Sequence, residues 1–214
     1  MRISKKILEF QQSSYIILFM KRILTLFILS GLLFLSAGAS FAEEEKTGVL
    51  DSIEVLAGFS SGELVRGQRS YMMAPISVAF NFNLKNLTKK LGFSLRQLFQ
   101  FQIEPFAGFI TSPKNNLETG TIFWFKMGFF PDTWKFQPYG KLGLGLDYMT
   151  AHIHQQSTQF NFTEQGALGM HYFLTAATAF TLEGRIRHLS NAGMREPNHG
   201  FNSYTLVTGI YHKF

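Results

Sequence analysis

The sequence predicts an all-β fold, an eight-stranded antiparallel transmembrane β-barrel. The first observation is the segment 178–190, in which Phe180, Leu182 and Ile186 share one face of a strand and charged residues fill the other. Such alternation fits a barrel with a polar interior and a lipid-facing exterior. The second observation is that no apolar run after residue 42 approaches the ~20 residues that a spanning helix needs. The third is the division of the remaining chain into short segments separated by polar turns.

The N-terminal segment is typical of a secretory signal peptide. The basic residues Lys21 and Arg22 precede the apolar run 23–35, and a stretch of mostly small residues ends at Ala42. We expect a signal peptide over 1–42, cleaved after Ala42, and a barrel domain over 43–214. A transmembrane anchor is the alternative, but the apolar run is short for a span. Residues 1–19 either extend the signal peptide or precede a start at Met20. The sequence has no cysteine, which excludes lipoprotein anchoring, disulfides and thiolate metal sites.

The net charge of the whole chain, +6, is concentrated in its N-terminal segment. Residues 1–42 contain five of the 20 Lys and Arg residues and one of the 14 Asp and Glu residues, which leaves 15 against 13 in the rest. The longest basic run of the expected mature chain is Lys89-Lys90. A net charge of +2 without a basic patch argues against nucleic acid as a partner.

Eight strands are predicted from the alternation of side chains. We place them at about 49–59, 71–82, 99–110, 120–131, 138–149, 159–173, 178–190 and 201–214. If the N-terminus is periplasmic, the loops 60–70, 111–119, 150–158 and 191–200 are extracellular. The segment 83–98 differs, because Leu84, Leu87 and Leu91 have helical spacing. It is either a long turn with a short amphipathic helix or an irregular loop.

The parity of each strand predicts which side chains face the lumen. In 141–148, Lys, Gly and Asp occupy the odd positions and Leu or Tyr the even ones, and inward glycines suit a narrow barrel. Charged residues on the inner face of 178–190 should form luminal ion pairs. Phe214 at the C-terminus resembles the assembly signal of outer-membrane barrels, although His212 departs from that pattern. Aromatic residues near strand ends are expected in an interfacial girdle: Trp134, Tyr139, Tyr148 and Tyr172.

The most informative motif for function lies at the end of the seventh strand. His188 and Ser190 are two residues apart, so on a strand they share a face, as a base and a nucleophile would require. The alternative is that Ser190 and Asn191 simply begin a loop, a role that both residue types favour. His152 and His154 could ligate a metal, but we interpret them as solvated loop residues, and we expect no metal or cofactor.

The run His188-Leu189-Ser190-Asn191-Ala192-Gly193, with Pro197, Asn198 and Gly200, resembles the lipid A 3-O-deacylases, the PagL-type outer-membrane esterases. The resemblance implies that Ser190 is the nucleophile and His188 the base, and that Asn191 and Gly193 help form the oxyanion hole. It also implies a bacterial outer-membrane location. The substrate would be the 3-position acyl ester of lipid A, in lipopolysaccharide.

One position departs from the family. Its triad glutamate would stand at Asn202, which pairs with His188 if 190 pairs with 200 across the last hairpin. Asn202 can orient an imidazole but cannot supply a negative charge. A tight turn near residue 176 makes paired numbers of the preceding hairpin sum to an even value near 352. A sum of 352 places Glu164 opposite His188, and a slip by two would place Phe162 or Gly166 there instead. We hypothesise that Glu164 replaces the missing acid; a hydrated interfacial Glu164 and a rival role for Glu196 are the alternatives.

Two function classes therefore remain open. The first is an esterase that acts on lipid A within the outer leaflet. The second is a non-enzymatic barrel, an adhesin or membrane-stabilising protein, that retains a relic motif. The intact Ser, His, Asn and Gly set favours the esterase, whereas Asn202 favours the relic. A lipid A acyltransferase would need a lumen shaped to hold an acyl chain.

Overall fold

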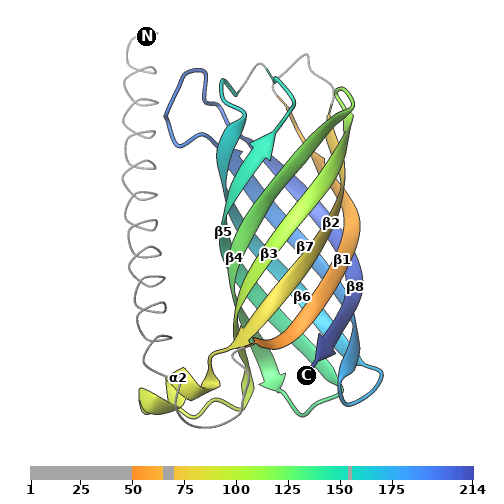
Figure 1. The fold of residues 1–214 in the computed structure, drawn as a ribbon, viewed down its shortest axis with the longest axis vertical. Coiled ribbons are helices and arrows are strands. Elements are labelled where there is room, and N and C mark those ends of the chain that lie inside the picture. Colours follow the sequence, from red (N-terminus) through yellow and green to blue (C-terminus); the bar gives the residue numbers. More distant parts are fainter. Residues whose placement is uncertain (1–49, 65–69, 154–155) are drawn as a thin grey trace, which may run out of the picture. The chain divides into compact units, whose positions relative to one another are not determined.

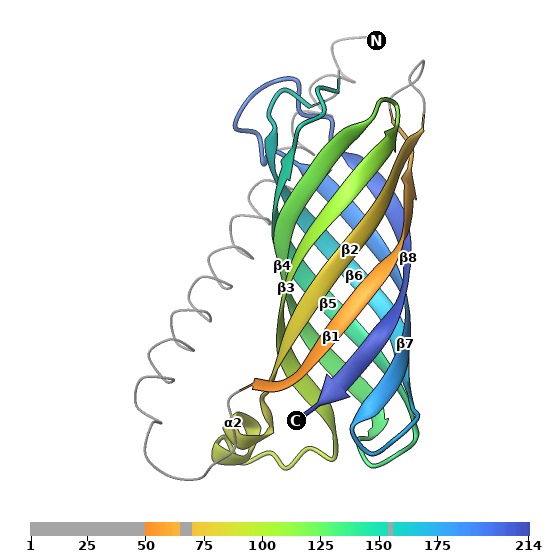
Figure 2. The same ribbon diagram turned by 45° about the vertical axis from the view of Figure 1, so that its right-hand side comes forward.

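The computed structural model describes residues 50–64, 70–153 and 156–214, which form a closed antiparallel barrel (Figure 1). Each strand pairs with its neighbours in the chain, and the first strand closes the barrel against the last (Figure 2). The predicted fold class is confirmed. The elements are β1 Leu50–Gly62, β2 Tyr71–Asn83, α2 Lys85–Lys90, β3 Gln97–Ser112, β4 Asn116–Pro131, β5 Phe136–Met149, β6 Phe160–Phe173, β7 Thr178–Ser190 and β8 Phe201–Lys213. The expected signal peptide, 1–42, lies outside the described residues. In the described ranges, no helix is both long and apolar enough to cross a membrane.

Side-chain parity decides which residues face the lumen, as predicted for β5. Its odd positions, including Lys141 and Asp147, are buried, whereas Leu142 and Leu146 on the even positions are exposed on the outer wall. The glycines on the inner face relieve crowding in a narrow lumen. A Cβ atom on Gly143 would lie 2.5 Å from the Trp124 ring.

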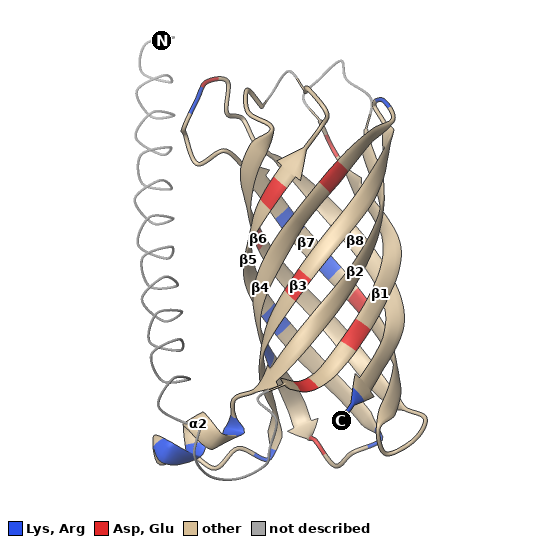
Figure 3. Ribbon diagram, in the orientation of Figure 1, with Lys and Arg blue, Asp and Glu red and all other residues tan. Residues whose placement is uncertain are grey.

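Charged residues are distributed along the strands of the barrel (Figure 3), and those on the inner face form ion pairs in the lumen. Arg185 bonds Glu104 with two nitrogens, at 2.7 and 3.2 Å, and Glu183 through Nε at 2.6 Å. Arg187 bonds Glu118. The predicted luminal pairing of the β7 charges is therefore confirmed. A void of about 30 Å³ lies between these side chains, so this part of the lumen has no room for an acyl chain.

The predicted loop 111–119 was wrong. β3 continues to Ser112 and β4 begins at Asn116, so only three residues connect them. The polar residues that suggested a loop belong to the ends of strands. Glu118, for example, points into the barrel and accepts a hydrogen bond from the Tyr71 hydroxyl at 2.6 Å.

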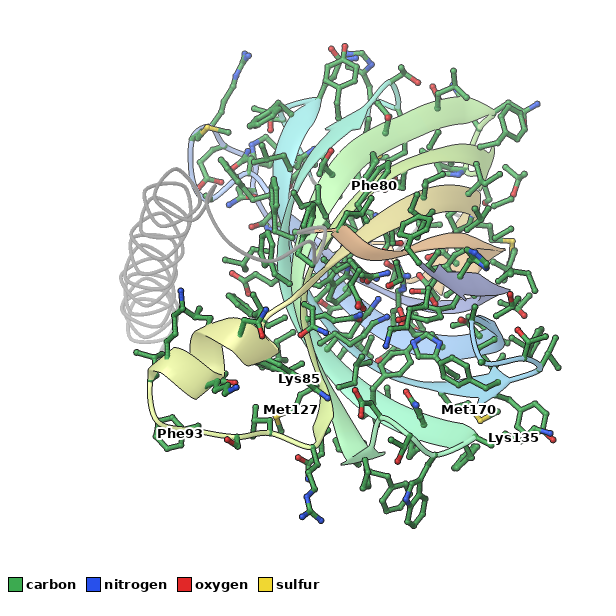
Figure 4. All side chains as sticks on the ribbon, turned by 60° about the horizontal axis from the view of Figure 1, so that its bottom comes forward. Phe80, Lys85, Phe93, Met127, Lys135 and Met170 are labelled. Atoms are coloured by element: carbon green, nitrogen blue, oxygen red, sulfur yellow. The ribbon has the colours of Figure 1, made fainter. Side chains whose placement is uncertain are left out.

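The segment 83–98 contains the predicted short helix, α2. Asn83 Oδ1 accepts a hydrogen bond from Lys85 N at 2.9 Å at its start, and Gly92, with φ of 87°, follows its end. Lys85 forms an ion pair with Asp132, which ties the helix to the connection after β4. Figure 4 views this end of the barrel, with Phe93 on the connection that follows the helix.

Tyr139 was wrongly assigned to the aromatic girdle. It is 0% exposed, and its hydroxyl donates to Glu183 in the lumen at 2.7 Å. Its odd position on β5 puts it on the inner face, and this parity overrides the preference of tyrosine for membrane interfaces. Trp134, Tyr148 and Tyr172 are about half exposed, as a girdle requires.

Candidate active site on the outer wall

The central residue of the site is a histidine on the middle one of three neighbouring strands. His188 of β7 pairs with Asn202 of β8 on one side and with Glu164 of β6 on the other, so both predicted registers are confirmed. His188 Nδ1 lies 2.7 Å from Asn202 Oδ1. Because an amide oxygen only accepts hydrogen bonds, Nδ1 must carry the hydrogen. Nε2 is then the unprotonated nitrogen of the neutral ring and can act as a base.

Gly200 fixes the position of the His188 ring. A Cβ atom on Gly200 would lie 2.9 Å from His188 Cε1 and 3.0 Å from His188 Nε2. It would also lie 2.8 Å from the carbonyl oxygen of Leu189. Gly200 has φ of 61°, a conformation that glycine adopts at little cost. This motif position therefore requires glycine for both its backbone and the imidazole that packs on it.

Ser190 ends β7 on the same face as His188, but it is less accessible than expected. Its exposed fraction is 6%, and its partner across the β6–β7 pair is Phe162. No hydrogen bond joins Ser190 to His188 in the described structure. Nucleophile–base bonds often tighten only when substrate binds. The strand register thus brings the two predicted groups together without forming their bond.

Asn191 organises the loop after β7. The side chain is 0% exposed; its Oδ1 accepts from Gly193 N at 3.0 Å and its Nδ2 donates to the Arg195 carbonyl at 2.7 Å. Its backbone N–H donates to Asn198 Oδ1 at 3.0 Å. The turn from Asn191 to Met194 has positive φ at both central residues, as in a type I′ turn. The donors expected in the oxyanion hole are therefore engaged within the loop.

The loop after β5, predicted at 150–158, supports this one through contacts that the sequence does not indicate. Pro197 O accepts from Ser157 N at 3.0 Å, and Gln156 forms a β-bridge with Asn198. Ser157 Oγ also donates to the Arg195 carbonyl at 2.8 Å. The motif residues Pro197 and Asn198 thus anchor the loop to 156–157. Nothing in the sequence links these two segments, which are about forty residues apart.

An apolar groove of about 610 Å³ runs along the outer wall from β2 to β6. Small side chains such as Ala107 and Thr121 line it, as do Leu146 of β5 and Phe160 of β6, the strands nearest the site. Leu146 pairs with Phe162, which pairs with Ser190. The groove therefore ends on β6, the strand next to the one that carries the candidate nucleophile.

Comparison with known proteins identifies the family. The family model described as lipid A 3-O-deacylase (PagL) matches residues 76–211, which include the His188–Ser190 pair and Asn202. The chain belongs to the PagL family.

Solved structures agree on the fold. The crystal structure of the outer membrane enzyme PagL is 16% identical, with a TM-score of 0.53, over 74% of this chain and 97% of that one. The crystal structure of Neisserial surface protein A is 12% identical, with a TM-score of 0.55, over 76% of this chain and 96% of that one. At these identities the two structures indicate only a shared barrel of the outer-membrane type. No curated protein matches the sequence.

The acids considered for this PagL-family site differ in their contacts. Glu164 is half-buried on the outer wall, and no ion pair joins it to His188 in the described structure. Because Asn202 already holds Nδ1, a direct bond from Glu164 could reach only Nε2. Glu196 is exposed and accepts from the backbone N–H of Asn198 at 3.1 Å, within the loop.

Metal ligation has no support in the described residues. They contain no cluster of three His, Asp or Glu side chains that could hold an ion. His152 is exposed, and His154 lies outside the described residues.

Proposed function

We propose that this PagL-family member removes the 3-position acyl chain of lipid A by serine esterase chemistry. Ser190 Oγ attacks the ester carbonyl while His188 Nε2 takes its proton. The proton then passes to the departing sugar oxygen, and water releases the fatty acid from Ser190. The observation that carries the proposal is the 2.7 Å bond from His188 Nδ1 to Asn202, because it leaves Nε2 as the base on the face of Ser190.

Asn191 and the amide of Gly193 are proposed to stabilise the oxyanion. For this to happen, the bond from Gly193 N to Asn191 Oδ1 must give way to the negatively charged substrate oxygen. A charged acceptor forms the stronger hydrogen bond, so the exchange is favourable once the tetrahedral intermediate forms. The turn thus keeps the Gly193 donor oriented before substrate arrives.

The location follows from the same proposal. Cleavage after Ala42 would deliver residues 43–214 to the outer membrane, and odd-numbered strands would run outward. β7 then ends at the level of the outer leaflet, with His188 and Ser190 on the lipid-facing wall. The apolar groove beside the site offers a place for an acyl chain of the substrate. N-terminal sequencing of the mature protein should begin at Glu43.

The amide at Asn202 determines the catalytic rate that we expect of this esterase. In serine proteases, changing the triad Asp to Asn lowers kcat by about 10⁴, largely through the wrong tautomer. Here Asn202 presents its oxygen to Nδ1, so the tautomer is correct and only the negative charge is missing. Glu164, opposite His188, would add charge through space without orienting the ring.

Mass spectrometry of lipid A from cells with and without the protein tests the proposal. We expect wild type to remove one acyl chain, and Ser190→Ala and His188→Ala each to abolish the loss. Both variants should show heat-modifiable migration in detergent gels, as evidence of a folded barrel. An active Ser190→Ala protein would overturn the mechanism. Unchanged lipid A with wild type would favour the non-enzymatic barrel, the reading that Asn202 supports.

A further inference from the structure

The strand on the far side of Asn202 carries a carboxylate. β8 pairs with β1 through Ser61 opposite Tyr204 and Gly62 opposite Ser203. Continued by one step beyond Gly62, this antiparallel ladder would place Glu63 opposite Asn202. The backbones of β1 and β8 lie close together at this point. A Cβ atom on Gly62 would be 2.5 Å from the Asn202 carbonyl oxygen.

Glu63 and Asn202 also share a face. Gly62 and Ser203 are buried on the inner face, whereas Glu63 and Asn202 are both exposed on the outer one. Directly opposed residues of antiparallel strands have Cβ atoms about 4.5–5.5 Å apart. A glutamate side chain spans this distance easily.

Asn202 has hydrogen-bonding capacity that faces away from the base. Its Oδ1 accepts from His188 Nδ1, and its Nδ2 carries two hydrogens that form no bond with any described residue. Nor does any described cation form an ion pair with Glu63. A carboxylate that accepts from Nδ2 would polarise the amide and make Oδ1 a better acceptor for the imidazole.

We propose that Glu63 is a positioning residue that supplies the missing negative charge through Asn202. This inference rests on the proposed esterase function. When Ser190 loses its proton to Nε2, the His188 hydrogen on Nδ1 stays in place and Asn202 stays neutral. Glu63 never receives the proton, and its charge stabilises the imidazolium across the amide.

Glu63 meets a requirement that Glu164 does not. A triad acid must act on Nδ1, because Nε2 is needed by the nucleophile. Asn202 occupies Nδ1, so a carboxylate can act there only through that amide. Glu63 lies on the Asn202 side of the histidine, whereas Glu164 lies on the opposite side.

A set of variants, assayed on purified lipid A, tests the relay. Glu63→Gln should lower kcat about tenfold with KM unchanged, a coupling of the size seen between neighbouring groups. Glu63→Asp should recover part of the loss. In an Asn202→Ala background Glu63→Gln should have no further effect, because the bridge is gone. In an Asn202→Glu background Glu63→Gln should also leave kcat unchanged, since the carboxylate at position 202 then acts directly on His188.

Two outcomes would contradict the relay: full activity of Glu63→Gln, or an equal loss in the Asn202→Ala background. Asp132→Asn, an acid-to-amide change in the connection after β4, is the matched control and should retain wild-type kcat. Ser190→Ala reports separately on the esterase proposal.

A spectroscopic measurement keeps the proposal testable if turnover is too slow to assay. In detergent micelles, the NMR shift of the Asn202 side-chain amide hydrogens should move upfield in Glu63→Gln and stay unchanged in Asp132→Asn. An Asn202 amide chemical shift that is unchanged in Glu63→Gln would overturn the proposal.

Discussion

At the scale of single residues, one hydrogen bond is central to the proposed chemistry of this site. In that proposal Asn202 takes the geometric role of a triad acid, because its Oδ1 lies 2.7 Å from His188 Nδ1. It gives up the electrostatic role, because an amide has no charge. Orientation and charge are therefore separable functions, and this chain keeps the first at position 202.

Gly200→Ala tests how closely the ring position controls activity. The new methyl group would contact His188 and the Leu189 carbonyl, and φ of 61° would strain alanine by ~1–3 kcal/mol. A ring displaced by about 1 Å costs on the order of 100-fold in rate. We expect that loss in lipid A deacylation, with heat-modifiable migration retained. Unaltered activity would show that the Gly200 contact does not position the base.

At the scale of elements, two loops and a groove surround the strand ends. The 191–200 loop is held by the side chain of Asn191, and by Ser157 from the neighbouring loop. Both loops lie at the end of the barrel where β7 ends (Figure 1). The strands set the register of the histidine, whereas the loops set the environment of the serine.

Asn191→Ala should loosen this loop. It removes the acceptor for Gly193 N and the donor for the Arg195 carbonyl, at a cost of about 1–3 kcal/mol. We expect faster tryptic cleavage after Arg195 and a large loss of activity. Ser157→Ala removes fewer bonds and should show a smaller effect on both measurements. Equal protease resistance of Asn191→Ala and wild type would contradict this role.

Filling the outer groove should weaken substrate binding. Ala107→Phe would place a ring on the groove floor, and we expect KM to rise about tenfold with kcat little changed. Ala74→Phe is a suitable control, because Ala74 also faces outward on β2 but does not line the groove. A KM that rises equally in both variants would argue against the groove as an acyl-chain site.

At the scale of the whole molecule, buried charge holds the barrel together. Glu104 accepts from Arg185, Ser77 and Trp124, so side chains from β2, β3, β4 and β7 meet in one network. Such a network spans the lumen and supports the wall on which the site is built. Removing one partner of a buried ion pair leaves the charge of the other without full compensation.

Glu104→Gln should therefore destabilise the barrel by about 3–5 kcal/mol. Adding Arg185→Met should restore part of the loss, because it removes the cation left in excess when Arg185 and Lys141 share the carboxylate of Glu183. Urea titration, followed by gel migration, measures the stability of the single and the double variant. A double variant less stable than Glu104→Gln would refute the pairing of Glu104 with Arg185. Activity of the folded fraction should be unchanged, since both residues point into the lumen.

The sequence alone predicted the barrel, the register of its last two hairpins around His188 and the faces of most of its strands. Period-two alternation assigns a side chain to lumen or lipid wherever a strand is continuous, and a tight turn near 176 fixed the pairing of Glu164 with His188. The tertiary structure alone decided what depends on contacts between distant segments. The polar residues around 111–119 extended two strands, because Glu118 bonds Arg187 across the lumen. The proposed approach of Glu63 to Asn202 depends on barrel closure, which brings β1 beside β8. Local patterns carry no information about such contacts.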